Sequence, residues 1–142
     1  NMRIIQVWRG KPVWIFKRTP EQLAVLPGLN PRLADPNSTN ADQTPAFARN
    51  PDRTIKGTET IGVIVGICTH LGCSPTYFPE MVPQPFDPEW QGGFYCPCHQ
   101  SRFDMAGRVF KGVPAPSNLE VPPYHYPDDN TIVIGVAPEG AV

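Results

Sequence analysis

The sequence lacks a long apolar run. Its longest, Ile61 to Ile67, is interrupted by Gly62 and Gly66. This stretch is far short of the ~18 apolar residues that indicate a transmembrane helix. No secretory signal opens the sequence, and Asn1 leads almost directly into a strand-like pattern. We therefore expect no membrane span in these residues, and we expect the native N-terminus to lie upstream of Asn1.

The sequence also lacks an excess of charge of either sign. Its 12 Lys and Arg residues against 13 Asp and Glu residues leave a formal net charge of -1. No basic run is present, so nothing favours a nucleic-acid partner. Internal repeats are absent as well.

Proline, in contrast, is abundant, at 19 of 142 residues, and 12 residues are glycine. Both residue types disfavour long helices and favour short strands joined by structured loops. Hydrophobic residues make up 40%, which is too many for a disordered chain. The length suits one domain with one core.

Hydrophobic and turn residues predict an all-β domain with one short helix. Thr19, Pro20 and Gln22 have the form of a capped helix start, and we expect Pro27-Gly28 to end that helix. β-Branched and aromatic residues between turn signals predict the strands. The expected strands begin with a hairpin over 2–19 that turns at 9–12, followed by a strand at 60–67. We then expect a hairpin over 103–110 that turns at Ala106-Gly107, and a final hairpin of 119–126 with 131–136.

Two segments rich in turn residues separate these elements. We expect residues 30–57 to be a surface excursion with at most one turn of helix near 46–49. Residues 74–93 contain five prolines before Gly92-Gly93, and we expect a second loop excursion there.

All four cysteines and two of the three histidines lie in two short segments, 68–73 and 96–99. Thiolate plus imidazole suits zinc, copper or iron–sulfur chemistry. Six candidate ligands are too many for one tetrahedral zinc, which takes four. One option is that one cysteine from each segment joins a disulfide while the other four side chains bind metal. That option pairs Cys73 with Cys98 and leaves Cys68, His70, Cys96 and His99 as ligands. A disulfide would imply an oxidising compartment.

These residues resemble the two motifs of the Rieske [2Fe–2S] proteins. The first motif is Cys-Thr-His-Leu-Gly-Cys at 68–73 and the second is Cys-Pro-Cys-His-x-Ser at 96–101, in the right order and about 20 residues apart. Residues 107–109, 112–116 and 118–124, and the opening segment 8–13, look like the Rieske subunit of cytochrome bc1 complexes. The resemblance covers most of the chain and is weakest at 30–57 and 74–93.

The resemblance implies one Rieske domain over residues 1–142. Its base would be an antiparallel β-sandwich formed by 1–66 and 118–142, with a small cluster-binding subdomain, 67–117, inserted in it. It also implies one [2Fe–2S] cluster per chain.

The resemblance implies ligand roles as well. Cys68 and Cys96 would bind one iron and His70 and His99 the other, and Cys73–Cys98 would be the disulfide. Two histidines in place of two cysteines raise the reduction potential, because the oxidised cluster is then neutral rather than doubly negative. Their outer ring nitrogens can carry protons, so the site can accept an electron and a proton together. His99 is the residue implied to hydrogen-bond the quinol.

Further positions would tune or cover the cluster. The Ser101 hydroxyl is implied to donate to a bridging sulfide, which raises the potential. Leu71 is implied to shield the cluster, and Pro114 belongs to a rigid loop that covers it. The chain departs from the family twice: Gln100 replaces a usual glycine, and Phe103 replaces a tyrosine that in many bc1 members donates to a ligand cysteine sulfur. We therefore predict a potential below that of tyrosine-bearing relatives.

The implied function is that of the Rieske subunit of quinol–cytochrome c reductase. It takes one electron from ubiquinol or another quinol at the cytochrome b site and passes it to cytochrome c1. The isolated head would be an electron carrier. In the family an N-terminal transmembrane helix, absent from this sequence, anchors the head on the periplasmic side of a bacterial inner membrane, or on the equivalent intermembrane-space side in mitochondria.

Two alternatives stay open. The first is a Rieske ferredoxin or the Rieske domain of a ring-hydroxylating oxygenase, but those proteins lack the two extra cysteines. The second is a non-redox, zinc-binding structural module. Metal and sulfide analysis separates a colourless zinc protein from a red-brown iron–sulfur protein.

Overall fold

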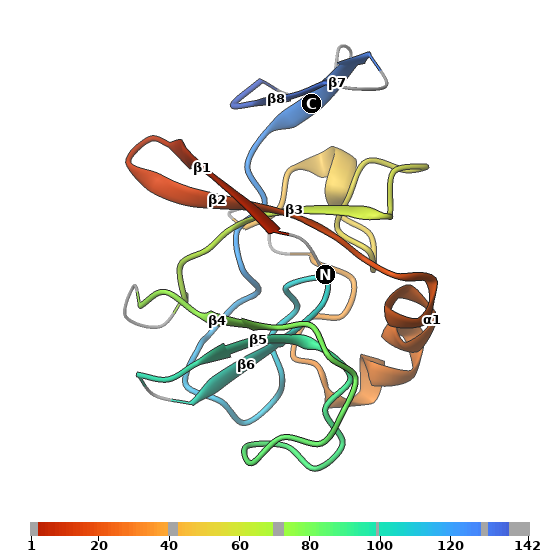
Figure 1. Cartoon of the computed structure of the whole chain (residues 1–142), viewed down its shortest axis with the longest axis vertical. Coiled ribbons are helices and arrows are strands. Elements are labelled where there is room, and N and C mark those ends of the chain that lie inside the picture. The colour runs from red at the N-terminus through yellow and green to blue at the C-terminus, as the bar shows by residue number, and fades with distance from the viewer. Residues whose placement is uncertain (1–2, 40–42, 70–72, 99, 129–130, 137–142) are drawn as a thin grey trace.

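The computed structural model describes residues 3–39, 43–69, 73–98, 100–128 and 131–136. Over these residues the chain forms three antiparallel sheets, one α-helix and two short 3₁₀ turns (Figure 1). The sheets contain β1 (Arg3–Trp8), β2 (Lys11–Lys17) and β3 (Ile61–Val65); β4 (Thr76–Phe78), β5 (Gly93–Cys96) and β6 (Ser101–Asp104); and β7 (Tyr124–Asp128) with β8 (Thr131–Ile134). The predicted all-β class with one short helix is confirmed.

The first hairpin forms where the sequence predicted it. β1 and β2 pair antiparallel, and Trp8 lies opposite Lys11, so the turn consists of Arg9 and Gly10 alone. Both have positive φ angles, 50° and 74°. This is the two-residue turn whose twist matches that of the flanking strands. β3 then pairs with β2 and completes the sheet.

The helix begins as predicted but ends later. In α1 (Pro20–Leu29), the backbone N–H of Gln22 donates to Thr19 Oγ1 at 3.1 Å, and the Gln22 side chain accepts from the Thr19 N–H at 2.8 Å. The prediction that Pro27-Gly28 ends the helix is wrong. Proline in the last turn removes one hydrogen bond, and burial of Leu29 together with the rest of the apolar face holds the turn in place. A 3₁₀ turn, η1 (Asn30–Arg32), follows directly.

The sequence predicted a loop over residues 74–93, but part of this segment forms a strand. It contains β4, in which Tyr77 pairs with Phe94 of β5. The two rings stack with centroids 5.4 Å apart, and Tyr77 also contacts Phe16 of β2 at 5.8 Å. Strand formation here depends on partners that are distant in the sequence, which local composition does not reveal.

Aromatic side chains fill the space between the first two sheets. Trp14 and Phe16 of β2 each contact Phe94 of β5, with ring centroids 5.3 Å apart in both pairs. Gly62 and Gly66 make room for these rings, because a Cβ atom at either glycine would collide with Phe16 or Trp14. The two sheets therefore pack face to face, with β1–β3 above β4–β6 in Figure 1, as in a sandwich.

The segment 30–57 contains the predicted helical turn, η2 (Ala46–Ala48). The expectation of a surface excursion is wrong, however, because Leu33 and Arg53 are each only 1% exposed. The Arg53 guanidinium donates to the carbonyl oxygens of Ala106 (3.1 Å), Gly107 (3.2 Å) and Leu119. Burial lowers the pKa of Arg53 to about 9, so it stays charged at neutral pH. This arginine ties the segment to the turn after β6.

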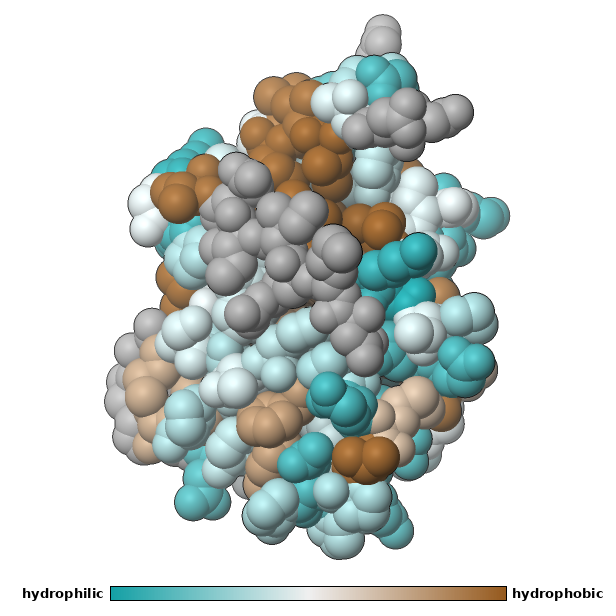
Figure 2. Space-filling view, viewed as in Figure 1, coloured by the Kyte–Doolittle hydropathy of each residue, from teal (hydrophilic) through white to brown (hydrophobic). Residues whose placement is uncertain are grey.

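The remaining hairpins are confirmed with adjusted limits. The return after β6 brings Val109 opposite Phe103. The last hairpin, β7–β8, begins at Tyr124 rather than at Leu119, and its turn residues 129–130 lie outside the described residues. Residues before Tyr124 instead run past β3, where the Val65 N–H donates to the Glu120 carbonyl oxygen at 2.7 Å. Figure 2 shows hydrophobic residues gathered near β7 and β8, at the top of the view.

The boundaries of the inserted subdomain, 67–117, stay a prediction. The sheet β4–β6 falls inside that range, and β1–β3, β7 and β8 fall outside it. Over the described ranges, the chain has no helix with the length and apolar character that a membrane span requires.

A buried ion pair stabilises the turn that follows β6. Asp104 and Arg108 are both fully buried, with Arg108 Nε 2.8 Å from Asp104 Oδ2. The other carboxylate oxygen accepts the backbone N–H groups of Ala106 and Arg108, both at 2.9 Å. Arg108 also donates to the Leu26 carbonyl oxygen at 2.8 Å, which connects the turn to α1. The pair therefore fixes where β6 ends relative to the helix.

We predict that Asp104→Asn lowers the free energy of unfolding by about 3–5 kcal/mol, because it leaves a buried guanidinium without its counter-charge. The matched control is Glu120→Gln, which removes an exposed carboxylate 3.5 Å from Lys11 and should cost less than about 1 kcal/mol. Urea unfolding monitored by circular dichroism measures both. Equal losses in the two variants would contradict the prediction.

Candidate metal centre

The two cysteine-bearing segments follow strands that the sheets place near each other. Cys68 comes three residues after the end of β3. Cys96 is the last residue of β5 and pairs with Ser101, the first residue of β6. The Gln100 N–H donates to the Cys96 carbonyl oxygen at 2.8 Å and closes the connection between these strands. The second motif is thus a tight hairpin loop.

A disulfide joins the two segments. It links Cys73 to Cys98, which are 25 positions apart in the sequence and have their Cα atoms 6.6 Å apart. This is the pairing that the resemblance implied. Closing a loop of this length stabilises the folded state by about 3–4 kcal/mol in the chain-entropy account. The disulfide also fixes the separation of two loops that contribute few side chains to the core.

The other two cysteines are more deeply buried than those of the disulfide. Cys68 and Cys96 are 3% and 1% exposed, and neither takes part in the disulfide. The Cys96 Sγ lies within 4.8 Å of the Sγ atoms of Cys73 and Cys98. Because disulfide sulfurs are not thiolates, these three sulfurs cannot act together as one metal-binding group. Cys68 and Cys96 are therefore the two cysteines that can bind metal.

Three predicted residues fall outside the described ranges. They are His70, Leu71 and His99. Their predicted roles, as iron ligands and proton-carrying groups for the histidines and as a shield for Leu71, stay predictions. So does the division of the four ligands between two irons.

Ser101, which the resemblance implied to donate to a bridging sulfide, is the first residue of β6. Its side chain is fully buried, and its hydroxyl oxygen accepts the Ala115 N–H at 3.0 Å. Accepting this bond leaves the hydroxyl hydrogen available for a second partner. The same bond anchors the 112–116 loop to β6, and Pro114 stands exposed next to the anchored Ala115.

A second contact holds that loop region to the first motif, and sequence reasoning missed it. Thr69 Oγ1 donates to the Ser117 carbonyl oxygen at 2.6 Å. Thr69 stands between two predicted ligands, Cys68 and His70, so the bond restrains the backbone that carries them. A threonine inside a ligand motif is the only signal in the sequence, and it does not reveal the partner.

The two departures from the family occupy different environments. Phe103 is fully buried in the main core, and its side chain has no group that could donate to a sulfur. Gln100 is exposed and has a φ angle of 63°. A left-handed backbone costs a residue with a side chain about 1–2 kcal/mol, and glycine adopts it freely. This conformation explains why a glycine was expected at this position.

The residues present suit an iron–sulfur group. Two buried cysteines outside the disulfide supply soft ligands, and a buried hydroxyl beside them can donate to a sulfur atom. The disulfide and the two loop contacts fix the backbone around these groups. A rigid, buried donor set of this kind can hold a cluster with little rearrangement when an electron is added.

Comparison with known proteins agrees with this chemistry. The family model of the Rieske [2Fe-2S] domain matches residues 38–124, which is more than half of the chain. Over 128 residues the chain is 55% identical to the "Ubiquinol-cytochrome c reductase iron-sulfur subunit" of Allochromatium vinosum, covering 90% of this chain and 60% of that protein. The subunit of the same name from Rhodospirillum rubrum is 41% identical over 133 residues, covering 93% of this chain and 63% of that protein.

A mitochondrial relative matches over the same extent. The "Cytochrome b-c1 complex subunit Rieske, mitochondrial" of Neurospora crassa is 41% identical over 133 residues, or 93% of this chain and 48% of that protein. The chain thus spans roughly half to three-fifths of the length of these relatives. From the family match, the disulfide-joined loops and the two buried cysteines, we conclude that the chain belongs to the Rieske [2Fe–2S] domain family.

Proposed function

We propose that this chain is the cluster-bearing head of the iron–sulfur subunit of a quinol–cytochrome c reductase. The observation that carries the proposal is the Cys73–Cys98 disulfide, which leaves Cys68 and Cys96 as the two buried cysteines outside it. The identity to subunits of that name over 90% or more of this chain supports the same assignment. Rieske ferredoxins and oxygenase domains, which lack the two extra cysteines, fit the disulfide less well.

Four side chains would hold the cluster. Cys68 and Cys96 would bind one iron, and His70 and His99 the other. When bound, the [2Fe–2S] group supplies a one-electron acceptor whose potential the protein adjusts. The disulfide keeps the two loops at a fixed separation, and the Ala115–Ser101 contact holds the 112–116 loop, with Pro114, over the site.

The remaining residues manage the proton and the potential. His99 would accept a hydrogen bond from quinol and take its proton at the outer ring nitrogen, and His70 would carry a proton in the same way. The Ser101 hydroxyl would donate toward sulfur and stabilise the added negative charge. Leu71 would keep water from the cluster. Electron and proton thus leave quinol together, and the electron passes on to a cytochrome.

The partners in this proposal are cytochrome b, at the quinol-oxidation site, and cytochrome c1. The relatives' printed names place those proteins in the bc1 complex or the quinol–cytochrome c reductase. We propose that a membrane anchor, outside these 142 residues, holds the head on the periplasmic side of a bacterial inner membrane, or on the intermembrane-space side in mitochondria. The disulfide suits either of these oxidising compartments.

Cluster content and pH dependence test the proposal directly. We expect two irons and two acid-labile sulfides per chain, and a midpoint potential that falls as the pH rises through the histidine pKa values. A one-electron, one-proton step gives about 59 mV per pH unit. Voltammetry at a series of pH values measures the slope. His125→Gln is the control, because His125 is hydrogen-bonded to Val136 in the last hairpin and should not affect the slope. Zinc in place of iron, or a flat potential, would refute the proposal.

Ser101→Ala should lower the midpoint potential, because it removes a hydrogen bond that stabilises the reduced cluster. It should also release the 112–116 loop, since the Ala115 N–H loses its acceptor. Ser117→Ala is the matched control, because the Ser117 contact to Thr69 uses its backbone carbonyl and survives the substitution. Voltammetry of both variants at the same pH measures the two midpoint potentials. If the two potentials were equal, Ser101 would have no such role.

Phe103→Tyr should raise the midpoint potential, because the new hydroxyl could donate to a ligand sulfur. Phe103 is fully buried, so the added oxygen needs such a partner. The control is Phe47→Tyr, in which the same change is made at a half-buried ring packed on Tyr124, in the last hairpin. An unchanged or lower potential in Phe103→Tyr would contradict the prediction.

A further inference from the structure

A pocket lies beside the second cysteine motif, outside the candidate metal centre. It is a pocket of about 380 Å³ between three segments of the chain. One wall is the 112–114 part of the rigid loop, another is the Pro85-Phe86 corner, and the third comes from β5, β6 and the turn between them. The last wall contributes Tyr95, Gln100 and Arg102. None of these residues is a predicted iron ligand.

Arg102 brings an unneutralised positive charge to this pocket. Its Nη1 donates to the Phe86 carbonyl oxygen at 3.2 Å, and its guanidinium lies 5.6 Å from the centre of the Phe110 ring. A guanidinium has five N–H donors, so most of them stay available. Across the ranges that the structure describes, no carboxylate forms an ion pair with Arg102.

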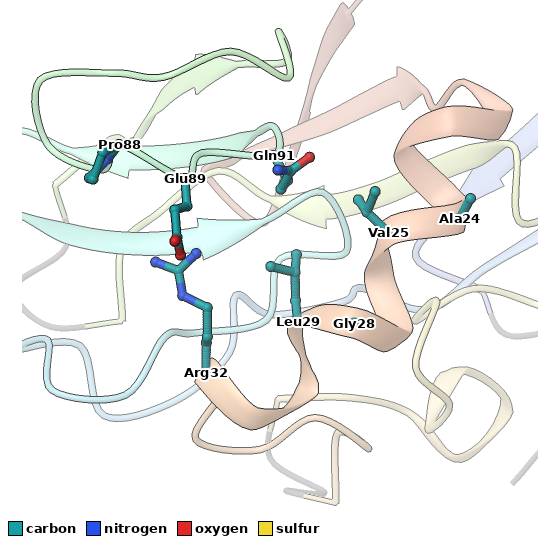
Figure 3. A pocket seen from close by; sticks show the side chains of 8 residues that line it. All are labelled: Ala24, Val25, Gly28, Leu29, Arg32, Pro88, Glu89 and Gln91. Carbon is teal, nitrogen blue, oxygen red and sulfur yellow. The ribbon is translucent and has the colours of Figure 1, made fainter.

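Arg32 provides an internal comparison. It contacts the same Phe110 ring, at 4.8 Å, but its guanidinium is paired with Asp87 at 2.7 Å. It belongs to a larger hollow of about 600 Å³ beside α1, where its side chain points toward Glu89 (Figure 3). That hollow therefore contains its own negative charge. The pocket at Arg102 has no acidic side chain among its lining residues.

The other two polar residues that line the pocket, Tyr95 and Gln100, are also held in place. The Tyr95 ring stacks on Phe86 with centroids 4.0 Å apart and an angle of 14° between the planes, which fixes the direction of its hydroxyl. Gln100 keeps a left-handed backbone that glycine would adopt without strain. Strained residues tend to be retained where they serve a function. Here the strained residue adds an amide group to the wall of the pocket.

We propose that this pocket binds a small monocarboxylate. The planar fork of a guanidinium matches a carboxylate with two parallel hydrogen bonds. One unpaired arginine supplies one positive charge, which matches a monoanion better than a dianion. The Gln100 amide and the Tyr95 hydroxyl can donate to the same anion, and the Phe86 ring offers an apolar contact for its carbon chain.

A carboxylate bound in this pocket would also affect the proposed cluster site, because the pocket adjoins the turn between β5 and β6. Cys96 and Ser101 border the turn that contains Gln100. A bound anion next to this turn places a negative charge near the electron acceptor and makes reduction less favourable. The site would then lower the midpoint potential when occupied. This second effect rests on the proposed function, whereas binding itself does not.

Calorimetric titration of the protein as purified, whatever metal it proves to contain, with propionate tests the proposal. Propionamide, which has the same shape without the charge, and sodium chloride at equal ionic strength are the controls. We expect one propionate per chain, no binding of propionamide, and affinity at least tenfold weaker in Arg102→Gln. Lys56→Gln, which removes an exposed positive charge outside the pocket, should bind propionate as the parent protein does.

Gln100→Gly separates a binding role from a structural one. It relieves the left-handed strain, so the melting temperature should rise, while propionate affinity should fall. A purely structural residue would not change these two quantities in opposite directions. Saturating propionate should also lower the midpoint potential of the parent protein and leave that of Arg102→Gln unchanged.

The results of these experiments support or refute the proposed carboxylate site. No propionate binding, equal binding by Arg102→Gln, or heat matched by chloride would overturn the proposal. Binding without any shift in potential would retain the site but refute its effect on the cluster. Failure of the iron and sulfide analysis would refute the proposed function and leave the carboxylate site standing.

Discussion

The Cys73–Cys98 disulfide is the constraint on which the rest of the site depends. It joins two loops that come from different sheets and that have few apolar side chains of their own. Without it, the positions of Cys68 and Cys96 would depend on the ends of β3 and β5 alone. With it, the two loops are joined covalently, and the Thr69 and Ser101 contacts can hold the surrounding backbone at short range.

The scaffold below the loops is built from aromatic packing and buried arginines. Trp14, Phe16 and Phe94 bring β2 and β5 together, and this contact sets the distance between the strands that lead to the two motifs. Arg53 and Arg108 then fill the interior around the turn after β6, where backbone carbonyl groups and Asp104 accept most of their hydrogen bonds. These hydrogen bonds, rather than strand pairing, hold together a region that is rich in prolines and loops.

The same constraints separate the two roles proposed for one short hairpin, β5–β6. Cys96 and Ser101 face the interior and are fully buried, whereas Gln100 and Arg102 line the outer pocket. Alternation along a strand places neighbouring side chains on opposite faces, so Ser101 and Arg102 can serve different sites. In the proposed function, one strand would thus contribute a hydroxyl to the cluster site on one face and a positive charge to the pocket on the other.

The residue pattern alone predicted a metal centre and most of the secondary-structure elements. The Cys and His residues indicated a metal centre, their resemblance to the Rieske motifs implied a [2Fe–2S] cluster, and the turn residues located the first hairpin and the start of α1, because these signals are local. Three features could not be predicted from that pattern: α1 continues past Pro27, β4 forms within a proline-rich segment, and Arg53 is buried. Each of these outcomes depends on contacts with residues far away in the chain: the apolar core around Leu29, the pairing of Tyr77 with Phe94, and the carbonyl groups of the turn after β6. Local propensity contains no information about such partners, and packing against them outweighs it.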